Sequence, residues 1–457
     1  MNLEKLFNPK SIAIIGASRD KTSVGYGIIK NLVKGCVFDC EYCEPFLGKI
    51  FPVNPKADLI LDLKTYKNVL EIQEEIDLAM IVVNSKIVLQ IVEQCIEKKV
   101  KSVIIISAGF AEFSKEGKKI QEEIVNKLTK ANIPMIGPNC LGIIMPHNNM
   151  NASFAPSMPP KGNIAFISQS GALADSITDW AIETNYGFSA IVSYGNKAML
   201  DIHNFLNYFD QDKNTKVITL YLEGVSDGKK FMQEAKKIKK PIIVLKAGRT
   251  EEGVKAISSH TGSLAGSYEV YKAAFKQSEI LVADTVEELL DNAKAIANMP
   301  KLKGEIAIIT NGGGCGILCA DYCSELKIPL AELSKTTIKK LDDSKKMHPA
   351  YSKRNPLDIV GDALPDRYEI AINTLLSEEN IKGTIIIQTL QSNTLSEENA
   401  KVIIKAKKKF PNKPILCVFL GGRFTKKSIG LLESAGIPNY NDLKKAALAM
   451  KALSKIE

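Results

Sequence analysis

The chain has 457 residues, of which 45% are hydrophobic, 24% charged and 7% aromatic, and this length suits about three domains of roughly 150 residues. The composition excludes a disordered or fibrous chain, and the net charge of +9 does not indicate nucleic acid, because the few arginines are scattered along the chain. No apolar run is long enough to span a bilayer and the N-terminus lacks a signal-peptide pattern, so we expect a cytoplasmic protein without a membrane partner.

Short apolar, β-branched runs alternate with longer amphipathic runs along the whole chain. This alternation predicts an α/β fold with parallel sheets flanked by helices such as 85–99 and 114–130. The predicted strands are 11–16, 78–83, 103–107, 164–168, 189–193, 217–222, 242–245, 306–310, 383–388 and 415–420. Turn-rich stretches at 146–160 and 298–304 divide the chain into three predicted domains, 1–145, 146–298 and 299–457.

The first predicted strand is followed by a glycine-containing turn, Gly16-Ala17-Ser18, and then by Val24-Gly25-Tyr26-Gly27. The spacing is not the G-x-G-x-x-G of dinucleotide-binding proteins. A second strand ends in Val53-Asn54-Pro55, without the acidic residue that binds the ribose of NAD. A nucleotide-bearing cofactor other than NAD is therefore favoured.

Three of the nine cysteines lie close together in the sequence. Cys36, Cys40 and Cys43 have a C-x3-C-x2-C spacing, which in other proteins can hold an iron–sulfur cluster. A fourth ligand is not evident nearby, so the favoured interpretation is a loop insertion with incidental thiols.

Two further turns have the character of phosphate-binding turns. Residues 164–176 and 306–321 both read as a buried strand, a turn of small residues and a helix, with Ser168-Gln169-Ser170-Gly171 and Asn311-Gly312-Gly313-Gly314 as the turns. A helix that starts at the carboxyl end of a parallel strand offers free amides and a positive dipole to an anion. The alternative is that each is an ordinary βα turn with an N-cap residue.

His260 differs from the other three histidines because it lies in a stretch of small residues, 258–266, that predicts an exposed loop. No second metal ligand accompanies it, so we predict no metal site there, and its imidazole could serve as a base or a nucleophile. Glu223, at the end of strand 217–222, is the candidate carboxylate that would orient the imidazole. The alternative is a surface histidine and an unrelated acid.

Taken together, these segments resemble the α subunit of the ADP-forming (NDP-forming) acyl-CoA synthetases, relatives of succinyl-CoA synthetase. The resemblance extends over nearly the whole chain and is carried by SIAIIGAS (11–18), SVGYGIIKNL (23–32), FPVNPK (51–56), IISAGFAE (105–112), IGPNCLGI (136–143), NIAFISQSGAL (163–173), LYLEGVSDGKKF (220–231), KPIIVLKAGRT (240–250), SSHTGSLAGS (258–267) and AIITNGGG (307–314). It implies a Rossmann-like CoA-binding domain followed by two flavodoxin-like ligase domains.

The resemblance also implies the reaction acyl-CoA + ADP + phosphate = acid + ATP + CoA. Phosphate would attack the thioester, and the acyl phosphate would phosphorylate His260, with Glu223 steadying the imidazole and the two turns holding the phosphoryl group. The implied CoA contacts are Gly16, Ala17, Ser18, Val24, Asn54, Pro55, Ser107, Ala108, Asn139 and Cys140. Two departures stand out: the segment from about Val37 to Leu47 looks like an insertion beside the CoA turn, and Cys315 stands where a proline is common.

The motifs of an ATP-grasp domain, which binds ADP with Mg²⁺ in this family, are not present in the sequence. We therefore expect a separate ATP-grasp β subunit that carries Mg²⁺ and ADP or ATP, in an α2β2 assembly. Two alternatives remain, a non-catalytic CoA-binding regulatory protein of the same fold and a nicotinamide oxidoreductase. The first is disfavoured because both phosphate turns are kept together with His260 and Glu223, and the second by the missing acidic residue.

Overall fold

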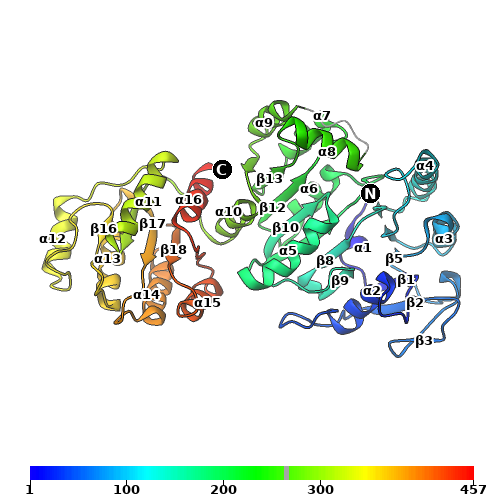
Figure 1. Ribbon diagram of the computed structural model, residues 1–457, viewed down its shortest axis with the longest axis horizontal. Coiled ribbons are helices and arrows are strands. Elements are labelled where there is room, and N and C mark those ends of the chain that lie inside the picture. Colours follow the sequence, from blue (N-terminus) through cyan, green and yellow to red (C-terminus); the bar gives the residue numbers. More distant parts are fainter. Residues whose placement is uncertain (262–266, 457) are drawn as a thin grey trace. The chain divides into compact units, whose positions relative to one another are not determined.

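A computed structural model of the chain describes residues 1–261 and 267–456, without the side chains of 258–261 (Figure 1). Its contacts divide the chain into two compact units, Met1–Asp284 and Thr285–Glu457. The first unit contains two main sheets and a small hairpin, and the second unit contains one sheet. The predicted boundaries at 145/146 and 298/299 stay predictions.

The first sheet is parallel, with strand order β2-β1-β5-β6-β7. Its strands are β1 (Ser11–Ile15), β2 (Lys49–Val53), β5 (Leu78–Ile81), β6 (Ser102–Ile105) and β7 (Met135–Ile136), with a hairpin of β3 (Leu59–Ile60) and β4 (Leu63–Lys64) beside it. Alternate residues of β1 belong to different hydrophobic clusters, Ile12 and Ile14 to one and Ala13 and Ile15 to the other. Both faces of this sheet are therefore buried, as continuous apolar strands predict.

The second sheet has the order β14-β13-β12-β10-β11-β8-β9. Its strands are β8 (Gly142–Met145), β9 (Met150–Ser153), β10 (Lys161–Ser168), β11 (Phe188–Ser193), β12 (Val217–Leu222), β13 (Ile242–Lys246) and β14 (Leu281–Ala283). The five later strands are parallel in the order of flavodoxin-like sheets, whereas β8 and β9 pair antiparallel at one edge. In such sheets ligands bind at the carboxyl ends, where the strand order reverses, which here lies between β10 and β12.

Helices connect these strands in the first unit. They are α1 (Glu4–Phe7), α2 (Val24–Lys34), α3 (Ser85–Glu97), α4 (Lys115–Lys130), α5 (Gly171–Thr184), α6 (Ile202–Gln211), α7 (Gly228–Ala235), α8 (Glu251–Thr261) and α9 (Tyr268–Gln277), with short 3-10 turns η1 (Val69–Glu71) and η2 (Pro146–Asn148). Helix α8 continues through Thr261, so part of the segment predicted as a loop around His260 is the end of a helix.

The second unit has a parallel sheet of order β16-β15-β17-β18. Its strands are β15 (Glu305–Thr310), β16 (Leu357–Asp358), β17 (Ile381–Gln388) and β18 (Ile415–Phe419), and its helices are α10 (Val286–Asn298), α11 (Gly313–Glu325), α12 (Lys335–Asp343), α13 (Pro365–Ser377), α14 (Ser396–Lys409), α15 (Lys426–Ser434) and α16 (Leu443–Lys455). Lys294 of α10 forms an ion pair of 3.1 Å with Glu433 of α15, and both side chains are largely buried. Helix α10 therefore packs within this unit.

The predicted α/β architecture with parallel sheets is confirmed. All ten predicted strands are present, with ends shifted by up to three residues. In the described part of the chain, no helix combines the length and apolar character that crossing a bilayer requires.

Candidate functional site

The carboxyl edge of the first sheet gathers most of the residues predicted to contact CoA. The strands are in register, with Ile15 opposite both Val53 and Ile81, and Ile81 opposite Ile105. The residues that follow these strands therefore lie along one edge, and they include the predicted set Gly16, Ala17, Ser18, Asn54, Pro55, Ser107 and Ala108.

Gly16 adopts a backbone conformation that requires glycine. Its φ is +103°, and an added Cβ would lie 2.2 Å from the carbonyl oxygen of Val82. Helix α2 begins directly against this turn, because a Cβ on Gly25 would lie 2.1 Å from the carbonyl oxygen of Gly16. The amides in the first turn of α2, where the predicted CoA contact Val24 lies, are therefore close to the Gly16 turn.

Polar side chains join the neighbouring strand ends. The Asn54 side chain donates to the Ala17 carbonyl at 2.7 Å, and the Ser107 hydroxyl donates to the Val83 carbonyl at 2.5 Å. The amide of Asn139 donates to the Ser107 carbonyl at 2.9 Å, so this residue, which is exposed, lies by the same edge. Cys140 instead points inward, where its Sγ lies 3.3 Å from the Ile105 carbonyl and burial raises the thiol pKa to about 12.

The second sheet brings Glu223 next to the first predicted phosphate turn. Glu223 follows β12, which pairs with β10, and the turn Ser168-Gln169-Ser170-Gly171 lies at the end of β10. The side-chain oxygen of Gln169 accepts hydrogen bonds from the amides of Glu223 and Gly224, and its nitrogen donates to the Gly224 carbonyl at 2.9 Å. Gln169 therefore holds the Glu223 backbone in place.

The turn itself is built to start helix α5. The Ser168 hydroxyl accepts from the Ser170 amide at 3.0 Å, and the Ser170 hydroxyl caps the helix by accepting from the Leu173 amide at 3.2 Å. The hydroxyls of both serines are thus used within the turn, so an anion here would meet the first-turn amides of α5, which have no partner within the helix.

Two lysines that the sequence analysis did not single out surround Glu223. Lys246, with 1% exposure, donates to the Glu223 carbonyl at 2.8 Å and lies over the Tyr271 ring, 4.5 Å from its centroid. Lys197 donates to the Gly224 carbonyl at 3.0 Å. Burial lowers the pKa of Lys246 to about 8, with nearby Glu223 opposing the shift, and burial also lowers the pKa of Lys197.

Lys246 could have been found from the sequence. It is the last residue of the apolar strand β13, and it pairs in register with Leu222, the residue directly before Glu223. A lysine at that position lies at the carboxyl edge where charged ligands are expected.

The second unit repeats this construction at Asn311-Gly312-Gly313-Gly314. Asn311 follows β15, and its side-chain oxygen accepts from the Thr389 amide at 2.7 Å while its nitrogen donates to the Thr389 carbonyl at 3.0 Å. The Thr310 hydroxyl accepts from the Gly312 amide at 3.0 Å, as Ser168 does from Ser170. Helix α11 begins at Gly313 without a side-chain cap, and the Cys315 amide of its first turn donates to the Gly312 carbonyl at 3.0 Å.

The side chain of His260 lies outside the described residues, so the predicted pairing of His260 with Glu223 stays a prediction. What the structure brings together around Glu223 is Gln169, Lys197 and Lys246 at the end of the second sheet. Glu223 is 9% exposed, so the residue as a whole is largely buried.

Comparison with known proteins connects these features to one family. Residues 10–146 match the model of a CoA binding domain, and residues 161–296 match that of the succinyl-CoA ligase like flavodoxin domain. The chain is 42% identical over its whole length to the acetate–CoA ligase [ADP-forming] I subunit alpha of Pyrococcus furiosus, of which it covers 98%.

Two further similarities show how much of a relative the chain spans. It is 43% identical to the acetate–CoA ligase [ADP-forming] I of Archaeoglobus fulgidus, over 99% of this chain but only 63% of the length of that relative. The dinucleotide-forming acetyl-coenzyme A synthetase 1 of Ca. Korarchaeum cryptofilum, solved in complex with phosphate and ADP, is 37% identical, with a TM-score of 0.91 over 100% of this chain and 97% of that one.

The family predicted from the motifs is thus confirmed, and relatives that are ligases favour the catalytic interpretation over the regulatory one. The chain belongs to the family of ADP-forming acetate–CoA ligases, in which it corresponds to the α subunit.

Proposed function

We propose that the chain is the α subunit of an ADP-forming acyl-CoA synthetase that catalyses acyl-CoA + ADP + phosphate = carboxylic acid + ATP + CoA. The observation that carries this proposal is the position of Glu223 beside a helix-starting turn at the reversal point of a flavodoxin-like sheet. The match to a relative named as an α subunit over 98% of its length supports it.

In the proposed reaction, a phosphate oxygen attacks the thioester carbonyl, the carbon–sulfur bond breaks, and CoA leaves as the thiol. His260 then attacks the phosphorus of the acyl phosphate, which releases the carboxylic acid and leaves a phosphohistidine. ADP takes the phosphoryl group from the histidine to form ATP. Glu223 would accept a hydrogen bond from the second imidazole nitrogen and so stabilise the cationic ring.

Each of the two turns is proposed to bind a phosphoryl group. Their amides supply hydrogen-bond donors, and the turns lie at the positive ends of the α5 and α11 dipoles. The charges of Lys197 and Lys246 add to the positive potential beside the first turn. The predicted edge of the first sheet, with Gly16, Asn54 and Ser107, is proposed to bind CoA.

We further propose that the partner is an ATP-grasp β subunit that binds ADP or ATP with Mg²⁺, in an α2β2 assembly. The relative from Archaeoglobus fulgidus supports a second component, because the chain covers 63% of it. The cytoplasmic location expected from the sequence stays a prediction.

A cofactor titration tests the proposal with the chain alone. CoA should bind with an affinity that the variant Gly16→Ala weakens, whereas NADH should bind at least a hundredfold more weakly than CoA. Tight binding of NADH with no binding of CoA would contradict the proposed function.

A further inference from the structure

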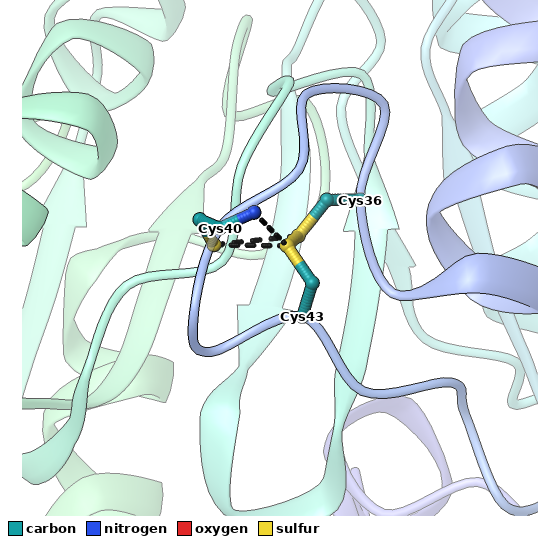
Figure 2. A group of neighbouring side chains, drawn as sticks. All are labelled: Cys36, Cys40 and Cys43. Atoms are coloured by element: carbon teal, nitrogen blue, oxygen red, sulfur yellow. Dashed lines mark hydrogen bonds between the residues drawn. A yellow bond between two sulfur atoms is a disulfide. The ribbon is translucent and has the colours of Figure 1, made fainter.

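Three cysteine sulfurs converge in the loop between α2 and β2, which the proposed function does not use. Cys36 and Cys43 form a disulfide, and the Cys40 sulfur lies 2.8 Å from that of Cys43 and 3.7 Å from that of Cys36 (Figure 2). All three sulfurs lie within 4.8 Å of one another. In the described part of the chain, no other group of histidine, cysteine or carboxylate ligands converges in this way.

The loop is fixed to the rest of the unit near both of its ends. The amides of Val37 and Phe38 both donate to the Pro156 carbonyl at 2.9 Å, and the Phe46 amide donates to the Leu32 carbonyl at 2.8 Å. The Cys40 sulfur lies 3.6 Å from the Met158 carbonyl. The backbone contacts do not involve the sulfurs, so they would keep the three side chains near one another when the disulfide is reduced.

The charges of the loop favour a bound cation. Asp39, Glu41 and Glu44 lie within it, and no lysine or arginine occurs between Cys36 and Gly48, although the chain as a whole carries +9. Lys161, from outside the loop, pairs with Glu44 at 3.4 Å, which leaves Asp39 and Glu41 as the acids beside Cys40. The amide of Cys40 donates to the Cys43 sulfur at 3.2 Å, and a hydrogen bond of this kind stabilises a thiolate.

The separation of the Cys36 and Cys40 sulfurs fits binding to one metal ion. A tetrahedral zinc ion binds thiolate sulfur at about 2.3 Å, which places two such sulfurs about 3.8 Å apart. The distance between the sulfurs of Cys36 and Cys40 is 3.7 Å. The Cys43 sulfur lies 2.8 Å from that of Cys40 and is bonded to that of Cys36, so it would have to move away from both when the disulfide is reduced. Three soft thiolates select a soft or borderline cation over Mg²⁺ or Ca²⁺.

We propose that Cys36, Cys40 and Cys43 bind a single thiophilic divalent cation of the Zn²⁺ class, with a solvent molecule as the fourth ligand. The Cys36–Cys43 disulfide is the oxidised, metal-free form of this site. A dithiol reductant gives two electrons and two protons to the disulfide and is itself oxidised to a disulfide. Zinc then replaces the protons of the three thiols, which are released to solvent.

The site would stiffen the loop where it runs along α2. Val37 lies against Gly27 in the second turn of this helix, and Lys30 of the same helix donates to the Val37 carbonyl at 3.0 Å. Because α2 starts at the predicted CoA turn, the metal would order a loop that borders the helix of the CoA domain.

Zinc competition with a chromophoric chelator tests the proposal on the full chain, reduced with a phosphine that is then removed. The expected result is one zinc per chain, with affinity lowered at least tenfold in each of Cys36→Ser, Cys40→Ser and Cys43→Ser. Co²⁺ should give thiolate charge-transfer absorption and the strong visible bands of a tetrahedral ion. Cys315→Ser, a partly exposed cysteine in the other unit, is the matched control and should bind zinc like the parent chain.

Cys40→Ser separates a metal site from a disulfide alone, because Cys36 and Cys43 suffice for the disulfide. Zinc binding that is unchanged in Cys40→Ser would overturn the proposal, as would zinc affinity in the reduced chain no greater than in the oxidised chain. Uptake of iron and sulfide in place of a single zinc on anaerobic reconstitution would also overturn it.

Discussion

Lys246 is a residue whose charge is disfavoured by its surroundings. Its amine is buried at the end of β13, and burial lowers its pKa from 10.5 to about 8. Between these two values the unfolded chain binds more protons than the folded chain, so this residue makes stability rise with pH from about 8 to 10.5. Below pH 8 the cost of the buried charge is fully present.

Urea unfolding of the parent chain and of Lys246→Met at several pH values between 7 and 10.5 measures this contribution. As the pH rises, the unfolding free energy of the parent chain should increase steadily relative to that of Lys246→Met. A difference that is constant across this range would show that Lys246 does not titrate there.

Glu223 is expected to act on the histidine and not on CoA. Glu223→Gln keeps the size of the side chain and removes its charge, so phosphoryl transfer should slow by about 100- to 1000-fold, in the range typical of a lost electrostatic contact. CoA affinity should be unchanged, since the predicted CoA residues belong to the other sheet of the unit. Single-turnover labelling with acetyl-CoA and phosphate gives the rate, and an unaltered rate would remove Glu223 from the mechanism.

At the scale of elements, helix α2 and the turn before it depend on two glycines. Gly16→Ala should destabilise the unit by about 1–3 kcal/mol or more, because a Cβ would meet the Val82 carbonyl at 2.2 Å in a residue with φ of +103°. Gly27→Ala is the matched control within α2, where the nearest atom would be 3.9 Å away, and it should stabilise the helix by up to about 1 kcal/mol.

Thermal and urea unfolding of the two variants check this prediction. Equal effects of Gly16→Ala and Gly27→Ala on the free energy of unfolding would contradict the role assigned to the turn.

The strands that could be predicted are those that the fold buries on both faces. Runs such as Val217–Leu222 are apolar and rich in β-branched residues over five or six positions, and this length and composition are typical of a buried strand. The missed strands β3, β4, β7, β14 and β16 are only two or three residues long, and they are strands only because a neighbour pairs with them. Antiparallel β9 was missed because it lies within the proline- and asparagine-rich stretch 146–160, which suggested a linker, and β8 directly precedes that stretch.

The candidate site, like the set of strands, could be predicted from the sequence only in part. That Glu223 meets the turn at Ser168 follows from the convergence of parallel strands at their carboxyl ends. The use of Gln169 to hold the Glu223 backbone depends on side-chain geometry that no pattern encodes. The convergence of the three sulfurs of the cysteine loop depends on backbone contacts of that loop to Leu32 and to Pro156, two residues that lie more than a hundred positions apart in the sequence. The spacing of the three cysteines does not reveal these contacts, so it favoured an interpretation as incidental thiols.

At the scale of the whole molecule, the proposed reaction is divided between two polypeptides. The chain covers 98% of a relative named as an α subunit and 63% of a longer relative. We expect the chain alone to bind CoA and to accept a phosphoryl group, and we expect ATP to form only when the partner is present.

The most direct test of this account is to incubate the chain with acetyl-CoA and labelled phosphate, with and without candidate β subunits, and to map the label. We predict an acid-labile, base-stable label on His260 that is absent from His260→Ala, and that ADP converts to ATP only when the partner is present. A stable label retained in His260→Ala would contradict the assignment of the histidine. No label from any acyl-CoA, despite good CoA binding, would contradict the catalytic account and favour a regulatory protein.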